Sequence, residues 1–460
     1  MSVHMLDMAV FEDALSAPEM RNVFEENALF QRWLDVEAAL ATAQASLGMI
    51  PAASGAAIAE AAKVERIDFQ AVKAHGRETG HSLVPLLREL RRVAGAEHAG
   101  YVHWGATTQD IVDTGLMLMV SAAWELVRKQ LLALMKALLG HLEAHRDTVM
   151  VGRTHGNHAL PVTFGFKVAG WLDELHRQVA RWDQARKRVL VGSINGAVGT
   201  FAPWGAQGLE VQSETCRLLE LGVPDAPWQS ARDRTAEAAT LCGLTAGTLS
   251  RIAQEIYLLA KTEVGELAEP FRHGMIGSST MPHKRNPIRT EWVLNLARMV
   301  RANAQTMMES MSAEHERDAS RWRTEWVRLP ESFLMLSGAL AHLIAVAEGL
   351  QVNVERMEAN LHLERGLLFS EPAMFALAEA GMPLDQAHHK VYEAAQRVYQ
   401  NGTQLLDELA ADAEITEIRG RDALAAVMEP RAHTGLAGVV VDKIRGKTAQ
   451  LIHGPPAGKG

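Results

Sequence analysis

Apolar residues recur along much of the chain at alternating three- and four-residue spacings, the period of a helix that buries one face. A long stripe of this kind runs through residues 114–145, which contain no proline and have glycine only near their ends. The same pattern predicts helices over residues 28–47, 162–189, 231–263, 288–312 and 332–349. The spacing therefore predicts a protein built mainly of helices, several of them long.

Glycine and proline divide the chain into three regions. They recur often before about residue 109, which predicts several short helices, and the long helical segments follow. After about residue 352 the segments shorten again, and the Gly- and Pro-containing residues 453–460 are expected to form a loose tail. We therefore predict an all-α fold with an N-terminal helical domain (1–109), a central long-helix bundle domain (110–352) and a C-terminal helical domain (353–460).

Two stretches without Asp, Glu, Lys or Arg raise the question of a membrane span. Residues 189–209 contain six glycines or prolines, which would break a helix. Residues 332–347 have helical spacing, but they carry His342 and are shorter than the roughly 20 apolar residues that a span needs. We interpret the second stretch as a buried core helix and expect no association with a membrane.

Composition narrows the class of protein. A hydrophobic content of 48% with 22% charged residues is typical of a folded globular chain. The formal net charge of −9 argues against a nucleic-acid partner. Cys216 and Cys242 cannot supply a disulfide framework, and the first ten residues lack the basic and apolar parts of a signal peptide. We therefore predict a cytoplasmic protein.

Three polar, glycine-containing segments carry side chains that suit neither a core face nor a simple solvated face. The first, residues 101–114 (YVHWGATTQDIVDT), leads into the first long helix. Thr107, Thr108 and Gln109 would add hydrogen-bond donors to the free N–H groups at the N-terminus of this helix, where a carboxylate is stabilised. The alternative is a helix cap without a ligand.

The second segment, residues 152–161 (GRTHGNHALP), places His155 and His158 three residues apart before another predicted helix. This spacing can bind a metal, but no Cys or carboxylate lies at a zinc-like distance along the chain, so we predict no metal. The histidines either cap or pack locally, or one of them transfers a proton near neutral pH.

The third segment, residues 274–287 (GMIGSSTMPHKRNP), combines two glycines, two prolines and three hydroxyl residues, which predicts a loop. Lys284 and Asn286 could bind one carboxylate through charge and hydrogen bonding together. A loop that is merely solvated would not need the Gly-Ser-Ser-Thr run before Met-Pro.

The run Gly277-Ser-Ser-Thr-Met-Pro-His-Lys-Arg-Asn-Pro287 resembles the signature loop of the fumarase/aspartase superfamily, and the two other segments match further regions of that superfamily in the right order. We call residues 274–287 the signature loop. The resemblance implies a mostly helical, three-domain subunit and a homotetramer with a central twenty-helix bundle. It also implies active sites shared by three subunits, a di- or tricarboxylate substrate, and β-elimination from a succinyl group, usually with release of fumarate. We predict no metal and no other cofactor.

Within the superfamily, the chain resembles the branch of adenylosuccinate lyase and 3-carboxy-cis,cis-muconate cycloisomerase. Residues 11–47, 103–118, 159–171 and 314–330 look most like the cycloisomerase. Thr154-His155-Gly156 and Thr79-Gly-His81 resemble the lyases instead, although residues 319–326 depart from the lyase segment that serves a nucleotide phosphate. The leading hypothesis is a carbon–nitrogen lyase that releases fumarate from an N-substituted aspartate. The alternatives are the cycloisomerase and, less favoured, a non-catalytic crystallin-like oligomer.

The resemblance also implies roles for individual residues. Ser278 would be the base, acting as an alkoxide because a neutral hydroxyl is too weakly basic to form a carbanion. Lys284 and Asn286 would hold the carboxylate beside the acidic carbon, and His155, with His81, would protonate or orient the departing atom. The other carboxylate would be anchored by Thr107, Thr108, Gln109 and Thr154. Independently of the resemblance, candidates for selecting the leaving group are Arg289, Arg321, Trp322 and Arg323; the alternative is that these side chains lie on a solvated face.

Overall fold

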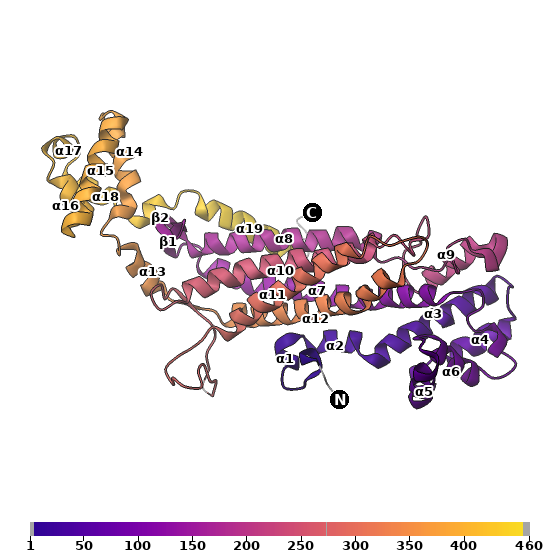
Figure 1. Ribbon diagram of the computed structural model, residues 1–460. Coiled ribbons are helices and arrows are strands. Elements are labelled where there is room, and N and C mark those ends of the chain that lie inside the picture. The colour runs from indigo at the N-terminus through magenta and orange to yellow at the C-terminus, as the bar shows by residue number, and fades with distance from the viewer. Residues whose placement is uncertain (1–3, 273, 454–460) are drawn as a thin grey trace. The chain divides into compact units, whose positions relative to one another are not determined.

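The computed structural model describes residues 4–272 and 274–453, and helices dominate it (Figure 1). The chain divides into two compact units. Unit 1 comprises Met1–Leu131, Gln178–Arg251 and Trp292–His342, and unit 2 comprises Leu132–Arg177, Ile252–Glu291 and Leu343–Gly460. The boundaries between the units fall within long helices, and the division into three consecutive domains stays a prediction.

Apart from α3, the N-terminal part of unit 1 is built of short helices, as the frequent glycines and prolines predict. They are η1 (Met5–Asp7), α1 (Glu12–Leu15), α2 (Pro18–Phe24), α3 (Glu26–Ser46), α4 (Ala52–Ala61), η2 (Val64–Arg66), α5 (Phe69–Thr79), α6 (Val84–Ala94) and η3 (Ala99–Tyr101). Helix α3 confirms the predicted helix over residues 28–47, and it buries Trp33 and Leu40 in a core shared with Ile58 of α4 and Leu86 of α6.

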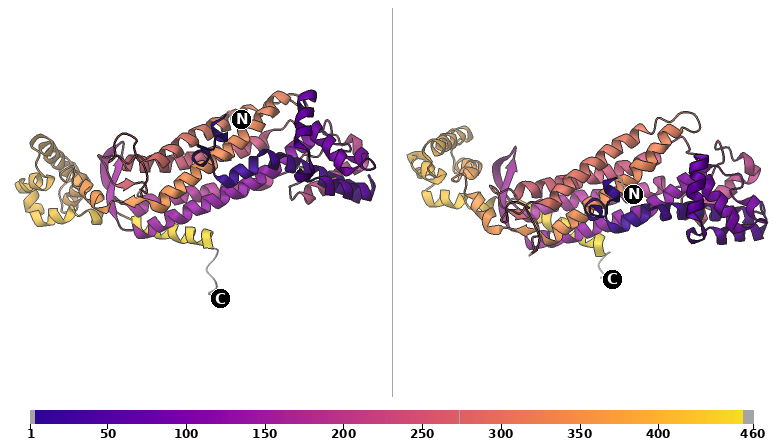
Figure 2. Two further views of the ribbon diagram at one scale, coloured as in Figure 1. Left: turned by 90° about the horizontal axis from the view of Figure 1, so that it is seen from below. Right: turned by 60° about the horizontal axis from the view of Figure 1, so that its bottom comes forward.

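Five longer helices confirm the predicted apolar stripes. They are α7 (Thr108–Ala144), α8 (Phe164–Val189), α10 (Asp233–Leu259), α11 (Ile288–Glu309) and α12 (Ala319–Gly349), which run side by side in Figure 2. In unit 1, the indole ring of Trp182 on α8 packs against Trp124 of α7, with ring centroids 4.4 Å apart. The same indole donates a hydrogen bond of 2.9 Å to Thr245 of α10. Buried aromatic side chains therefore join α7, α8 and α10.

The two uncharged stretches have different structures. The glycine-rich stretch after α8 forms no α-helix before η4 (Ala202–Gln207) and α9 (Gly208–Leu218), as its glycines predict. The second stretch lies in α12, which begins at Ala319 despite the internal Pro330. Among the described residues, one helix, α12, is both long enough and apolar enough to cross a membrane. However, 67% of its most apolar segment is buried inside the structure. This pattern is a weak indication of a span, since core helices of soluble proteins share it.

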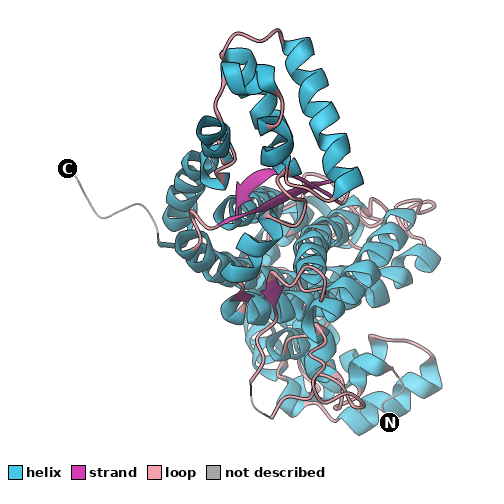
Figure 3. Cartoon of the chain, turned by 90° about the vertical axis from the view of Figure 1, so that its left-hand side faces the viewer, coloured by secondary structure: helices cyan, strands magenta, loops and turns pink. Residues whose placement is uncertain are grey.

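Unit 2 contains a feature that the sequence did not predict. Residues 149–163 form an antiparallel hairpin of β1 (Val149–Thr154) and β2 (Asn157–Thr163), visible as long strands in Figure 3. The helix expected after residues 152–161 is present as α8, which begins at Phe164, but the sequence did not predict that these residues first pair with each other as strands. A second, short pair joins β3 (Leu267–Ala268) to β4 (Gln351–Val352).

The C-terminal part of unit 2 returns to short helices, as predicted. They are α13 (Val354–Leu361), η5 (Leu367–Phe369), α14 (Ser370–Glu379), α15 (Leu384–Asn401), α16 (Leu405–Ala410), α17 (Ala413–Ile418), α18 (Arg421–Val427), η6 (Pro430–His433) and α19 (Ala437–His453). Leu377, Val391, Leu405 and Leu424 share one core cluster, which joins α14 to α18. The predicted tail after His453 lies outside the described residues.

Candidate active site

The predicted carboxylate anchor in unit 1 is a tightly held helix N-terminus. The backbone N–H of Thr107 donates to Asp110 in the first turn of α7, at 3.0 Å, which closes a capping arrangement. Asp110 also accepts the backbone N–H groups of Asn195 and Gly196, each at 2.9 Å. Burial raises the pKa of Asp110 to about 7, although these three N–H groups favour its ionised form. The turn carrying Thr107 and Thr108 is therefore fastened to the loop after α8.

Gln109 is fully buried, and its amide is occupied by protein partners. Its Nε2 donates to Asp113 at 3.0 Å and to the carbonyl oxygen of Gln229 at 2.8 Å, while its Oε1 accepts from the Nε of Arg317 at 2.9 Å. In this structure Gln109 therefore supports its neighbours, and direct contact between its amide and a substrate stays a prediction.

Arg317 was missed by reasoning from the sequence. Its Nη2 donates to the hydroxyl of Thr107 at 3.1 Å and to the carbonyl oxygen of Ala197 at 2.7 Å. The guanidinium therefore brings a positive charge to the helix N-terminus where a carboxylate was expected to bind. The signal in the sequence is weak, since Arg317 lies 208 residues after Gln109.

A buried ionic cluster lies beneath this turn in unit 1. Arg232 donates to Asp113 at 2.8 and 3.1 Å and to Glu325 at 2.8 and 2.6 Å, and all three residues are at most 1% exposed. Burial alone would lower the pKa of Arg232, but the two carboxylates raise it. Trp322 donates its indole N–H to Asp113 at 2.7 Å and is 7% exposed. The suggestion that Trp322 selects a leaving group was therefore wrong, because its polar atom is used in the core.

Two histidines of unit 1, His81 and His103, are held by hydrogen bonds to their neighbours. His81 accepts the backbone N–H groups of Leu83 and Val84 at its Nδ1, both at 3.2 Å, and so caps the start of α6. This arrangement leaves Nε2 as the donor of a neutral ring. His103 has a left-handed backbone (φ 64°), and its Nδ1 lies 2.6 Å from Glu37. Burial lowers the pKa of His103, but the charge and hydrogen bond of Glu37 outweigh burial and raise it.

The hairpin in unit 2 places His155 at its tip. Thr154 pairs with Asn157, so His155 and Gly156 alone form the turn, with φ of 53° and 81°. Positive φ at both central residues is typical of a type I′ turn, in which a non-glycine residue is strained. Thr154 and His155 are exposed. The hairpin therefore presents the predicted proton donor on a short, stiff support.

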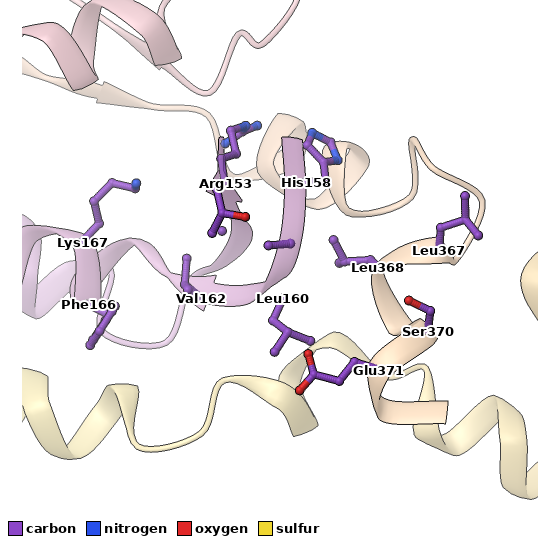
Figure 4. A pocket seen from close by; sticks show the side chains of 13 residues that line it. Arg153, His158, Leu160, Val162, Phe166, Lys167, Leu367, Leu368, Ser370 and Glu371 are labelled. Carbon is purple, nitrogen blue, oxygen red and sulfur yellow. The ribbon is translucent and has the colours of Figure 1, made fainter. Parts of the chain in front are cut away.

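A pocket of about 540 Å³ adjoins the hairpin within unit 2 (Figure 4). The residues that line it include Thr154 and Leu160 of the hairpin, Lys167 of α8, Leu368 of η5 and Glu371 of α14. His158, which lines the pocket, has a buried Nδ1 without a hydrogen-bond partner. Burial, followed by the charge of Arg153, lowers the pKa of His158.

The signature loop holds Ser278 in a turn of its own. The Oγ of Ser278 accepts the backbone N–H groups of Thr280 at 3.3 Å and Met281 at 3.1 Å. Two such donors stabilise negative charge on the oxygen, which an alkoxide base requires. A Cβ at position 277 would lie 2.4 Å from the carbonyl oxygen of Lys284, so glycine permits the two sides of the loop to meet.

The structure distributes the predicted residues between the two units. Unit 1 holds His81, Thr107, Thr108 and Gln109, and unit 2 holds Thr154, His155, Ser278, Lys284 and Asn286. Within unit 2, the first two lie on the hairpin and the last three on the signature loop. Lys284 is exposed and Asn286 is half-buried. Their roles stay predictions. Within residues 4–272 and 274–453, no group of three His, Cys, Asp or Glu side chains could hold a metal ion.

Comparison with known families gives two matches. The family model described as "Lyase" matches residues 13–302, and the model described as "Adenylosuccinate lyase C-terminus" matches residues 366–444. The match to the first model alone covers more than half of the chain.

Individual relatives match over nearly the full length of the chain. An N-acetyl-S-(2-succino)cysteine lyase of Enterococcus italicus is 41% identical, over 96% of this chain and 97% of the relative. A 3-carboxy-cis,cis-muconate cycloisomerase of Bradyrhizobium diazoefficiens is 39% identical, over 94% and 96%. An adenylosuccinate lyase of Pyrococcus abyssi is also 39% identical, over 96% and 97%.

The fold has a close counterpart among solved structures. The 3-carboxy-cis,cis-muconate lactonizing enzyme of Pseudomonas putida superimposes with a TM-score of 0.90 at 36% identity, covering 96% of this chain and 99% of that one. Sequence and structure therefore point to one group of enzymes.

Proposed function

Because the chain belongs to the fumarase/aspartase superfamily of lyases, we propose that it cleaves a small 2-succinyl substrate by β-elimination and releases fumarate. The observation that carries this proposal is the environment of Ser278, whose hydroxyl oxygen accepts two backbone N–H groups in the signature loop. The matches to enzymes argue against a non-catalytic oligomer.

In the proposed mechanism, the Ser278 alkoxide removes a proton from the carbon beside one carboxylate. The resulting carbanion places its charge on that carboxylate, where Lys284 and Asn286 would stabilise it most strongly in the transition state. The other carboxylate would bind at Thr107, Thr108 and Thr154. Arg317 supports this assignment, because its guanidinium hydrogen-bonds the Thr107 hydroxyl.

His155 would protonate the atom that leaves as the carbon–heteroatom bond breaks. His81 uses its Nδ1 to cap α6, so its Nε2–H would orient the leaving atom rather than supply the proton. Because the Nδ1 of His81 is occupied in this way, we assign the role of general acid to His155. A nitrogen leaving group needs that proton more than a sulfur one, since a thiol has a pKa near 8.5 and departs readily as the thiolate.

We propose a leaving group without a nucleotide, either an amine of an N-substituted aspartate or the thiol of a succinylated cysteine. The sulfur alternative is supported by relatives named N-acetyl-S-(2-succino)cysteine lyase, at 41% and 39% identity. Against a nucleotide, residues 319–326 lack the lyase pattern for a phosphate, and Trp322 of this segment is buried.

A substrate panel tests this proposal. Purified protein is offered N-acetyl-S-(2-succino)cysteine, several N-substituted aspartates, adenylosuccinate and carboxymuconate, and ultraviolet absorbance follows fumarate or carboxymuconate. The His155→Asn variant should lose about 10²–10⁴-fold in kcat on an aspartate and distinctly less on the thioether. An equal loss on both substrates would contradict the assigned role of His155.

The second candidate is the cycloisomerase reaction, which the relative from Bradyrhizobium diazoefficiens and the fold of the lactonizing enzyme favour. In this reaction the same base and carboxylate sites would act on carboxymuconate and its lactone. Turnover of carboxymuconate alone in the panel would replace the fumarate-releasing proposal with this one.

We also propose a cytoplasmic homotetramer whose active sites combine residues of several subunits. Large apolar side chains lie exposed on the long helices, as expected of surfaces that pack against other subunits. They include Leu244, Leu258, Met299, Met308 and Val327. Mixing inactive Ser278→Ala and His155→Asn subunits should restore activity if the sites are shared, and should leave the mixture inactive if each chain holds a complete site.

A further inference from the structure

The residue directly before Thr154 and His155 is tied to a buried carboxylate. Arg153 donates through Nη1 and Nη2 to the two carboxylate oxygens of Glu266, at 2.9 and 2.6 Å. Glu266 is fully buried, while the Arg153 side chain is 20% exposed. A two-pronged contact of this kind fixes the orientation of the guanidinium as well as its position.

Glu266 is itself held from three directions within unit 2. Asn360 of α13 donates its amide to Glu266 at 2.7 Å and to the carbonyl oxygen of Val264 at 2.9 Å. The carbonyl oxygen of Glu266 accepts the backbone N–H of Asn353 at 2.9 Å, and the next residue, Leu267, pairs with Val352. The carboxylate that receives Arg153 is therefore part of a rigid frame.

The same frame borders the signature loop. Glu269 lies three residues after Glu266 and accepts the backbone N–H groups of Arg289 at 3.2 Å and Thr290 at 2.6 Å. These N–H groups open α11, directly after the loop. Glu269 therefore ties the segment that follows the signature loop to the segment that precedes it. Through Glu266, three residues earlier, the preceding segment is also paired with Arg153 of the hairpin.

We propose that the Arg153–Glu266 pair is a positioning element that holds the hairpin, and with it the tip carrying His155, in a fixed orientation on this frame. This inference rests on the proposed function of His155. Arg153 does not touch the reacting atoms in this assignment; it acts through the hairpin.

The geometry explains how the pair reaches His155. Arg153 pairs with His158 across the hairpin, and Figure 4 labels both residues on its two strands. Only Thr154 and Asn157 separate this pair from the two-residue turn. Because the turn is so short, a change in the orientation of the Arg153–His158 pair also displaces His155 at the tip. A displacement of about 1 Å at a catalytic group costs up to 10²-fold in rate.

Kinetics distinguish positioning from general support of the fold. The Arg153→Lys variant keeps the positive charge but loses the pair of parallel hydrogen bonds that the guanidinium donates. The Glu266→Gln variant keeps the size of the side chain but loses its negative charge. Each should lower kcat about tenfold with little change in KM. In a His155→Asn background the same substitutions should cost less than about twofold, because the group they position is gone. An equal fold-loss in both backgrounds would overturn the proposal.

Hydrogen exchange provides a readout that needs no turnover, so failure of the proposed function is recognised separately. Glu266→Gln should speed amide exchange in residues 150–160. The matched control is Glu408→Gln, which breaks the 2.7 Å pair between Arg397 and Glu408 on α15 and α16. The control should leave exchange in the hairpin and kcat unchanged. Unaltered exchange in the hairpin of Glu266→Gln, or an equal response in the control, would overturn the proposal even if the panel showed no activity.

Discussion

The helix N-terminus at residues 107–109 and the signature loop at residues 274–287 are held in opposite ways. Thr107 and Gln109 are fixed by Asp110, Asp113 and Arg317, and the three residues from Gln109 to Ile111 are fully buried. In the loop, the hydrogen bonds to Ser278 come from the loop itself, and Ile276 is 77% exposed.

This difference suits the helix N-terminus to binding substrate and the signature loop to the chemical step. A prearranged anchor binds a carboxylate without paying for its own ordering, whereas a loop with few buried contacts moves at small cost. We therefore expect the signature loop to close over bound substrate, which would exclude water from Ser278. Substitutions around the anchor should mainly lower the free energy of unfolding, and substitutions in the signature loop should mainly lower kcat.

The largest effect is expected from Ser278→Ala. Loss of the base should lower kcat by roughly 10⁴-fold, while the substrate still binds at the anchor. Turnover assays and calorimetric titration with substrate measure the two effects. Ser279→Ala is the matched control, and activity that survives in Ser278→Ala but not in Ser279→Ala would show that the base is misassigned.

Arg232→Met should produce the largest loss of stability. It leaves Asp113 and Glu325 buried without their cation, which costs about 3–5 kcal/mol of unfolding free energy. Arg188→Met is the control, since its pair with Glu237 is largely exposed and should contribute less than about 1 kcal/mol. Urea unfolding at fixed protein concentration measures both, and equal losses would refute the supporting role of the buried cluster.

Gly277→Ala should damage turnover without damaging the fold. The added Cβ would approach the carbonyl oxygen of Lys284 to 2.4 Å and the Cα of Arg285 to 2.9 Å, so the two sides of the loop must separate. We expect kcat to fall about 10- to 100-fold. The melting temperature should stay within a few degrees of the parent, because the loop is exposed; a large drop would mean that the loop also stabilises the fold.

The smallest effect concerns Asp110 and pH. Its pKa of about 7 in the folded protein exceeds the roughly 3.9 of an unfolded chain, so its stabilising contribution is present below pH 4 and is lost as pH rises through 7. Relative to the parent, the melting temperature of Asp110→Asn should therefore rise between pH 5 and 8. Asp442→Asn should show no such trend, since Arg146 lowers the pKa of Asp442. A relative fall for Asp110→Asn would mean that its three N–H donors keep it ionised.

The helices could be predicted from the sequence, because a buried face imposes its period directly on α3, α7 and α10. The hairpin was missed although His155-Gly156 lies between short apolar runs, since the strands are brief and histidine is an uncommon turn residue. The supporting partners could not be found by spacing. Glu266 is 113 residues from Arg153, and only folding brings the two together.

The most direct test of the central claim is whether fumarate appears together with a free thiol or amine when purified protein meets a 2-succinyl substrate. We predict equal amounts of fumarate and leaving group from the parent protein and none from Ser278→Ala. Conversion of carboxymuconate to its lactone, with no fumarate from any 2-succinyl substrate, would contradict the account.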